Sequence, residues 1–315
     1  MAAVIELSDI AKSFGAHHAV SGLSMRVEEG EVFGFLGPNG AGKTTTLRIL
    51  LDIIAPDTGS RRLFGGATAK EAAKRIGYLP EERGLYKNMT AEHVIAYLAR
   101  LKGMDKATAT KRARDLLDRY GLGGAAKKRV KQLSKGMAQK VQVLSTLAHD
   151  PDLLILDEPF SGLDPVNQQV LEGLLADQKA AGKTVIFSTH VMQHAERLCD
   201  RILLIAGGRD IFAGRIAEAR ATLPPRIRLR SPGDVAPLRD LPFVRDITSC
   251  GSTDGITEWE IDADRSLSVE RLIATCSEHA IPIAYFAMIE PSLHDVFVHF
   301  VGPEAVRHNL AGGEG

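Results

Sequence analysis

The chain has 315 residues, a length that suffices for one large domain with a small one, or for two medium domains. Its residues are 44% hydrophobic and 25% charged, which is typical of a globular protein with a well-formed core. Its 39 lysines and arginines balance 39 aspartates and glutamates, which argues against a nucleic-acid partner, and its three cysteines are typical of reduced cytosolic thiols. No apolar run approaches the roughly 20 residues that span a bilayer, so we expect a partner chain to supply any membrane span.

Short apolar runs and glycine-containing turns predict strands in the N-terminal part of the chain. These strands are expected at Val4–Leu7, Met25–Glu28 and Val32–Leu36, followed by an edge strand at Arg61–Phe64. Phe14 lies between the first two strands. An exposed aromatic ring there could stack on a nucleotide base, although a phenylalanine is more often part of the core.

The third strand leads into a loop that matches the phosphate-loop pattern G-x-x-x-x-G-K-[ST]. The loop comprises Gly37, Pro38, Asn39, Gly40, Ala41, Gly42, Lys43, Thr44 and Thr45. A helical pattern follows, so free N–H groups and the dipole of a helix N-terminus favour a polyphosphate in the loop. Lys43 can reach the terminal phosphates, and the Thr44 hydroxyl can ligate Mg²⁺. The alternative is a tight strand–helix turn with a chance lysine, which the two matching flanks disfavour.

The middle of the chain changes from a strand pattern to a helical one. Ile76–Leu79 is a predicted strand, and Glu81 lies in the loop after it. From about Thr90 to Ala148 apolar residues recur at helical spacing without a strand signal. This indicates a helical subdomain at about residues 82–150 within an otherwise α/β chain. A basic run inside it, Lys127–Lys131, is expected to be a solvated loop and not a nucleic-acid contact.

Three further apolar runs predict buried parallel strands at Leu153–Leu156, Val185–Phe187 and Ile202–Ile205. The first ends in Asp157 and Glu158. The carboxyl ends of parallel strands are the usual place for chemistry in an open α/β sheet, so we expect the active site there.

The residues at these strand ends have separate candidate roles. Asp157 lies where phosphate-loop proteins hold Mg²⁺, and Glu158 is free to polarise a water for attack on a γ-phosphate. The plainer alternatives are an ordinary surface acid for Glu158 and a core histidine for His190, which follows the second strand. His194, four residues later, is a weak metal signal because no third ligand is evident.

The composition shifts near Pro224 and Pro225, and alternating strand and helix signals follow. Strands are predicted at 227–230, 244–249, 257–261 and 283–288, and helices at 234–240, 268–280 and 293–301. This order is that of the ferredoxin-like split β-α-β motif. We therefore expect a small α+β domain at residues 225–302 and a disordered tail at 303–315.

Taken together, the motifs resemble those of ABC ATPases. Leu133–Met137 is similar to the signature loop of that family, and Ser161–Asp164 resembles the D-loop. Ile76–Glu81 resembles the Q-loop, His190 the switch histidine and Phe14 the adenine-stacking aromatic. The Q-loop and signature variants are similar to those of exporter ATP-binding subunits, the group that includes sodium-extrusion and drug-resistance ATPases.

This resemblance implies an ABC-type P-loop NTPase over residues 1–220, with an antiparallel β edge and a helical subdomain, followed by the accessory α+β domain. It implies an ATPase that uses ATP and Mg²⁺ at the cytoplasmic face of the membrane and energises export through a separate integral membrane permease. Two copies would form a homodimer in the ATP-bound state, with each ATP between one phosphate loop and Ser134 and Gly136 of the other copy. His190 would hold the γ-phosphate and the attacking water.

The chain departs from the wider family at three positions. Glu81 stands where the family has Gln, as a candidate Mg²⁺ ligand, and Lys135 and Met137 replace Gly and Gln in the signature. Three other functions stay open: a non-transport ABC ATPase acting on ribosomes or DNA, a nucleotide-gated regulator or scaffold, and an importer ATPase. A single phosphate loop disfavours the ribosome- or DNA-acting ATPase. The presence of Glu158 and His190 disfavours a regulator or scaffold. The exporter-like Q-loop and signature disfavour an importer.

Overall fold

The structure is a computed structural model that describes residues 2–82 and 84–302. The described chain forms two compact units, and the division falls after Ile216, a few residues before the boundary expected near residue 220. The expectation of a disordered tail at 303–315 concerns residues outside the described part.

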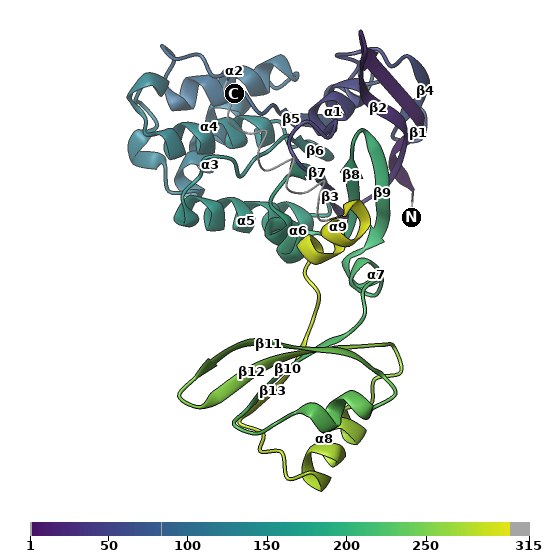
Figure 1. The fold of residues 1–315 in the computed structure, drawn as a ribbon. Helices are drawn as coiled ribbons and strands as arrows, with labels where there is room; N and C mark the ends of the chain where they lie inside the picture. The colour runs from purple at the N-terminus through teal and green to yellow at the C-terminus, as the bar shows by residue number, and fades with distance from the viewer. Residues whose placement is uncertain (1, 83, 303–315) are drawn as a thin grey trace. The chain divides into compact units, whose positions relative to one another are not determined.

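Three antiparallel strands form one sheet of the first unit: β1 (Ala3–Phe14), β2 (His17–Glu28) and β4 (Thr58–Leu63), in the order β2-β1-β4 (Figure 1). β1 and β2 have 12 residues each and are longer than the sequence predicts. Toward the hairpin turn polar residues interrupt the apolar ones, so these ends lack the apolar runs that indicate a buried strand. Phe14 is therefore the last residue of β1 and does not lie in a loop.

The central sheet has the strand order β5-β6-β7-β3-β8-β9. Its strands are β3 (Val32–Leu36), β5 (Ile76–Leu79), β6 (Leu153–Leu156), β7 (Thr184–Thr189), β8 (Arg201–Ala206) and β9 (Arg209–Arg215). Neighbouring strands are parallel except β8 and β9, an antiparallel hairpin that the sequence analysis missed. β3, β6 and β7 are buried along their whole length, as predicted, because apolar clusters pack on both faces. Their carboxyl ends meet at one edge of the sheet.

The helical insertion consists of α2 (Ala91–Leu101), α3 (Lys106–Arg119) and α4 (Lys135–Leu147), which lie together on one side of the first unit (Figure 1). Each begins at a side chain that accepts a hydrogen bond from the first turn: Thr90, Asp105 and Ser134. Leu101 at the end of α2 is 63% exposed, and three alanines lie on the buried face of this helix. Three further helices follow strands: α1 (Lys43–Leu50), α5 (Pro165–Ala180) and α6 (Met192–Leu198).

A lysine and a histidine hold the start of β5. Lys102 Nζ, just after α2, donates to the carbonyl oxygens of Ala73 at 2.7 Å and Ile76 at 3.1 Å. His149 Nε2 lies 3.1 Å from the same Ile76 oxygen. Burial lowers the pKa of Lys102, and burial together with the charge of Lys102 lowers the pKa of His149 from 6.5 to about 4. The histidine is therefore neutral, with its proton on Nε2.

Stability is expected to fall with acid through His149. The unfolded chain binds a proton near pH 6.5 and the folded chain only near pH 4, so the free energy of unfolding decreases as the pH drops through this window. After allowance for partial exposure, the decrease is about 2 kcal/mol. His149→Gln keeps a donor for Ile76 and should lack this decrease. Urea unfolding of the native protein and of His149→Gln between pH 4 and 7 measures the free energy of unfolding of each. If both free energies change equally with pH, the prediction is contradicted.

The second unit contains an antiparallel sheet in the order β11-β12-β10-β13. The division falls within α7 (Ile216–Arg220). The elements after it are β10 (Arg226–Ser231), a 3₁₀ helix (Ala236–Asp240), β11 (Val244–Thr253), β12 (Ile256–Ala263), α8 (Val269–Glu278), β13 (Tyr285–Ile289) and α9 (Leu293–Val301). This topology is the ferredoxin-like arrangement expected from the order of elements. The α-helix predicted at 234–240 is wrong: the segment is a five-residue 3₁₀ helix, too short to repay α-helix nucleation.

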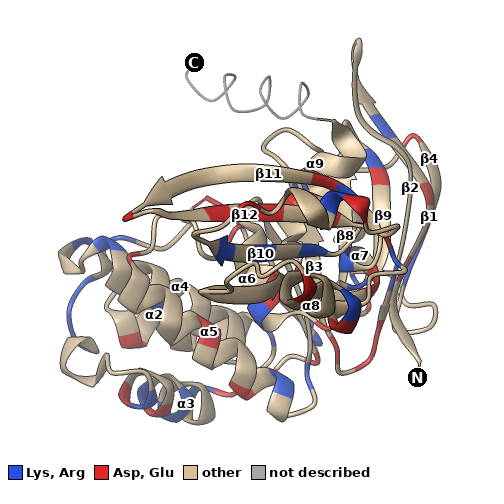
Figure 2. Cartoon of the chain, turned by 60° about the horizontal axis from the view of Figure 1, so that its bottom comes forward, with Lys and Arg blue, Asp and Glu red and all other residues tan. Residues whose placement is uncertain are grey.

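One face of this sheet carries rows of opposite charge. Arginines alternate along β10 and acidic residues along β12, as the blue and red strands of Figure 2 show. Ion pairs join Arg226, Arg228 and Arg230 to Glu258, Glu260 and Asp262. All these side chains are partly exposed, so each pair contributes less than about 1 kcal/mol. The opposite face packs an apolar core against α8.

Candidate functional site

The phosphate loop of the first unit follows β3 and ends in α1. Two of its positions accept only glycine. A Cβ on Gly37 would lie 2.4 Å from the Ile205 carbonyl oxygen, and a Cβ on Gly42 would lie 2.3 Å from that of Ala19. Gly42 also has φ +101° and caps α1. β2 and β8 therefore press on the loop from two sides and fix its path.

Lys43 folds back over this loop. Its Nζ donates to the carbonyl oxygens of Gly37 at 2.7 Å and Pro38 at 3.0 Å. Its side chain is only 6% exposed. The ammonium group thus sits over the loop that the sequence predicts to hold phosphates, where oxygen atoms already surround a cation.

The two predicted carboxylates follow β6, next to the end of β7. Ser188 Oγ donates to Asp157 Oδ1 at 2.6 Å and accepts a hydrogen bond from the Glu158 N–H at 2.8 Å. Asp157 Oδ2 is buried and has no hydrogen-bond partner among the described residues. A buried carboxylate oxygen without a donor fits a metal ion or its bound water, so this atom suits the Mg²⁺ role predicted for Asp157.

The three predicted catalytic residues come together at Glu158. Its Oε1 lies 3.3 Å from Lys43 Nζ, and its Oε2 lies 3.0 Å from His190 Nδ1. The Glu158 side chain is 7% exposed, whereas that of His190 is 44% exposed and reaches solvent. The contact to Lys43 is an ion pair outside hydrogen-bond geometry. One carboxylate therefore joins the phosphate loop to the end of β7.

Sequence reasoning missed the role of Ser188. Ser188 is fully buried, and it bonds both the Asp157 carboxylate and the backbone N–H of Glu158. A hydroxyl that closes an otherwise apolar buried strand was the available signal, because a buried polar atom has to find a partner.

The remaining predicted residues lie at different distances from this cluster. Phe14 is half exposed at the end of β1, in the hairpin whose second strand contacts Gly42 through Ala19. Glu81 is exposed just beyond β5, and the last residue of that strand, Leu79, accepts a hydrogen bond from the Asp157 N–H at 2.8 Å. Neither residue makes a hydrogen bond or ion pair with the phosphate loop or the two carboxylates among the described contacts.

The signature residues belong to the start of α4. Ser134 is its exposed N-cap and accepts a hydrogen bond from the Met137 N–H at 3.2 Å. A Cβ on Gly136 would lie 2.6 Å from Asn167 Nδ2, so the helix start packs closely against α5. Among the described contacts, no hydrogen bond or ion pair links Ser134 or Gly136 to the phosphate loop of the same chain. They are available to a ligand held elsewhere.

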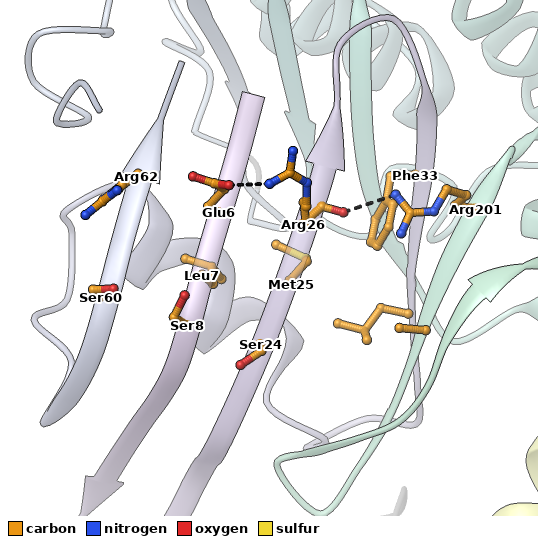
Figure 3. A pocket seen from close by; sticks show the side chains of 12 residues that line it. Glu6, Leu7, Ser8, Ser24, Met25, Arg26, Phe33, Ser60, Arg62 and Arg201 are labelled. Atoms are coloured by element: carbon orange, nitrogen blue, oxygen red, sulfur yellow. Dashed lines mark hydrogen bonds and ion pairs between the residues drawn. The ribbon is translucent and has the colours of Figure 1, made fainter. Parts of the chain in front are cut away.

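A cavity of about 570 Å³ lies away from these residues, on the β1-β2-β4 sheet and the neighbouring strands (Figure 3). Arg26 crosses it to pair with Glu6, and Arg201 donates to the Arg26 carbonyl oxygen. None of its lining residues belongs to the predicted site. Its volume therefore does not identify the functional site, whereas the chemistry at Glu158 does.

Comparisons with known proteins agree with the geometry. A family model described as ABC transporter matches residues 20–161. An uncharacterized ABC transporter ATP-binding protein of Bacillus subtilis is 37% identical over 306 residues, which cover 95% of this chain and 99% of that protein. The chain belongs to the ATP-binding subunits of ABC transporters. This family is one of ATPases.

Relatives of this ABC subunit include proteins named for export and resistance. The linearmycin resistance ATP-binding protein of Bacillus subtilis is 32% identical over 95% of this chain and 98% of its own. A Nod factor export ATP-binding protein of Paraburkholderia xenovorans is 42% identical over 67% of this chain and 71% of its own. In the described part of the subunit, no helix has both the length and the apolar character needed to cross a membrane.

Solved structures confirm the ABC ATPase fold. An ATP-binding subunit of an ABC transporter superimposes with a TM-score of 0.64 at 30% identity, covering 70% of this chain and 92% of that one. A dimeric ATP-binding cassette in a post-hydrolysis state with ADP and Pi gives a TM-score of 0.62 at 25% identity, covering 67% of this chain and 98% of that one. The predicted P-loop architecture is therefore confirmed.

Proposed function

We propose that this subunit hydrolyses MgATP as a head-to-tail homodimer at the cytoplasmic face of the membrane and powers export through a separate membrane-spanning partner. The observation that carries the proposal is the cluster in which the buried Glu158 carboxylate joins the buried Lys43 and the half-exposed His190. The names of relatives in export and resistance support the direction of transport.

Within this proposal, each residue of the cluster has one task. Lys43 exchanges the carbonyl oxygens of its own loop for the terminal phosphates of ATP. Glu158, once free of Lys43, accepts a proton from the attacking water, and His190 contacts the γ-phosphate from the solvent side. Phe14 stacks on the adenine. The backbone N–H groups of the loop and of the α1 N-terminus hold the phosphate oxygens.

Mg²⁺ fits the residues present. Thr44 and the unpartnered Oδ2 of Asp157 would hold it, and Glu81 is the third candidate ligand. When bound, the ion neutralises charge on the phosphate oxygens. Glu81 is an exposed carboxylate where the wider family has an amide, so its part in metal binding is the least supported of the three.

The second ATP half-site would come from the partner copy. The exposed N-cap Ser134 and the adjacent Gly136 present a helix N-terminus with free N–H groups to an anion held elsewhere. A regulator or scaffold without turnover is disfavoured, because such a protein would not need a buried carboxylate poised beside the phosphate loop.

The membrane partner can be tested by co-expression. Alone, the subunit is expected to stay in the supernatant after ultracentrifugation. Expressed with the membrane protein of a neighbouring reading frame, one with about six spanning segments, most of it should sediment with the membranes. Retention in the supernatant, together with ATP turnover that the membrane protein does not alter, would argue for a non-transport role.

A further inference from the structure

A buried glutamine connects the signature helix to the loop that carries the catalytic carboxylate. Gln139 lies in α4, and its side-chain Nε2 donates to the Pro159 carbonyl oxygen at 2.7 Å. Gln139 is 7% exposed, and Pro159 directly follows Glu158. We propose that Gln139 is a positioning residue through which nucleotide at one ATP site sets Glu158 at the other. This inference rests on the proposed head-to-tail pairing.

The backbone of the loop after β6 depends on contacts from other segments to keep its conformation. Glu158 has φ +47°, a left-handed conformation that residues other than glycine rarely adopt. Backbone strain of this kind persists only where surrounding contacts fix it. Ser188 Oγ accepts from the Glu158 N–H at 2.8 Å, and the Ser161 N–H donates to the Glu158 carbonyl oxygen at 3.1 Å. The Gln139 bond acts on the next carbonyl along the chain.

The two sides of this loop are held by different parts of the first unit. The Phe160 ring stacks on His194 of α6, with centroids 4.1 Å apart and an interplanar angle of 11°. It also meets the edge of Phe187 in β7 at 5.7 Å. These contacts fix the loop to the α/β part. Gln139 reaches it from the helical subdomain, so any shift of α4 relative to the central sheet pulls on the Pro159 carbonyl.

The helix that carries Gln139 also carries the signature. Ser134 caps α4, and Gln139 lies five residues later, about 7.5 Å along the same helix. In the proposed dimer, Ser134 contacts the nucleotide of the partner copy, whereas Glu158 acts on the nucleotide of its own copy. Docking of the signature on the partner's ATP therefore moves Gln139 with it. Each site then reaches its productive geometry only when the other is filled, which gives positive cooperativity in hydrolysis.

Gln139→Met tests this coupling, because methionine keeps the volume and removes the donor. At saturating ATP, turnover by the purified full chain should fall about tenfold with KM within twofold, and the Hill coefficient for ATP should drop from above one to about one. Ser145→Ala is the matched control. Its hydroxyl is also buried in α4, but it bonds to Val141 of the same helix at 2.7 Å and should leave both quantities unchanged.

Several outcomes would overturn the inference. These are a native Hill coefficient of one, an unchanged Hill coefficient in Gln139→Met, or an equal effect of Ser145→Ala. If Gln139→Met does not fold, Gln139→Asn places the amide one methylene short of Pro159 and takes the same two measurements. Failure of the proposed function is recognised separately: either the native chain shows no ATP turnover, or Glu158→Gln forms no ATP-dependent dimer.

Discussion

Glu158→Gln is expected to lower ATP turnover by roughly 10²–10⁴-fold while ATP still binds. Glutamine keeps the shape of the side chain and can still accept from His190, but it cannot take a proton from water. Phosphate release at saturating ATP and Mg²⁺ measures the loss, and titration with a fluorescent ATP analogue measures binding. A turnover within a few-fold of the native value would remove Glu158 from its role as general base.

The same variant should trap the dimer. ATP that is bound and not hydrolysed keeps a phosphate loop and the partner's signature together, so light scattering should show twice the native mass when ATP and Mg²⁺ are added. Glu31→Gln is a suitable control, because Glu31 is also a buried carboxylate of the first unit. It pairs with Arg201 at 3.3 Å and has no proposed role in ATP binding or hydrolysis. It should hydrolyse ATP at the native rate and remain monomeric. A Glu158→Gln chain that stays monomeric at high concentration would contradict the head-to-tail model.

Lys43→Met is expected to destabilise the nucleotide-free protein by about 3 kcal/mol. The substitution leaves the Glu158 carboxylate buried, with His190 as its one side-chain partner among the described residues, and the desolvation cost of its charge is then no longer offset. Chemical denaturation without nucleotide measures the free energy of unfolding. The expected loss exceeds the effect of a typical point substitution, because the pair lies almost entirely out of solvent.

A double-mutant cycle isolates this ion pair. Glu158→Gln alone should cost less than Lys43→Met, since Lys43 retains the carbonyl oxygens of Gly37 and Pro38. The double variant should be more stable than Lys43→Met alone, because no unpaired buried charge remains. Equal unfolding free energies for Lys43→Met and the native chain would show that the two groups do not interact in the nucleotide-free protein.

Much of this architecture is predictable from the sequence, for physical reasons. β3, β6 and β7 are buried on both faces, so their residues form unbroken apolar runs, and the phosphate loop has a fixed glycine spacing because its backbone must bend closely. Strand ends deliver Asp157, Glu158 and His190 to one edge once the sheet is recognised as parallel. These features depend on local patterns along the chain.

What the sequence did not predict depends on contacts between distant segments. Ser188 and Gln139 are single polar residues whose partners, Asp157 and Pro159, lie 31 and 20 residues away. The ion pair of Lys43 with Glu158 likewise requires the folded sheet. The outer ends of β1 and β2 carry too few apolar residues to be recognised as strands, and they form because each pairs with its neighbour.

The close approaches around the phosphate loop also order events during synthesis. The loop is complete by Thr45, but its shape depends on Ala19 before it and on Ile205 and Gly208 far after it, the last donating its N–H to Ala41 at 3.2 Å. We therefore expect a nascent chain to bind ATP only after residues near 208 have emerged from the ribosome and paired with the loop. From then on ATP stabilises the first unit by mass action while the second unit is still being translated.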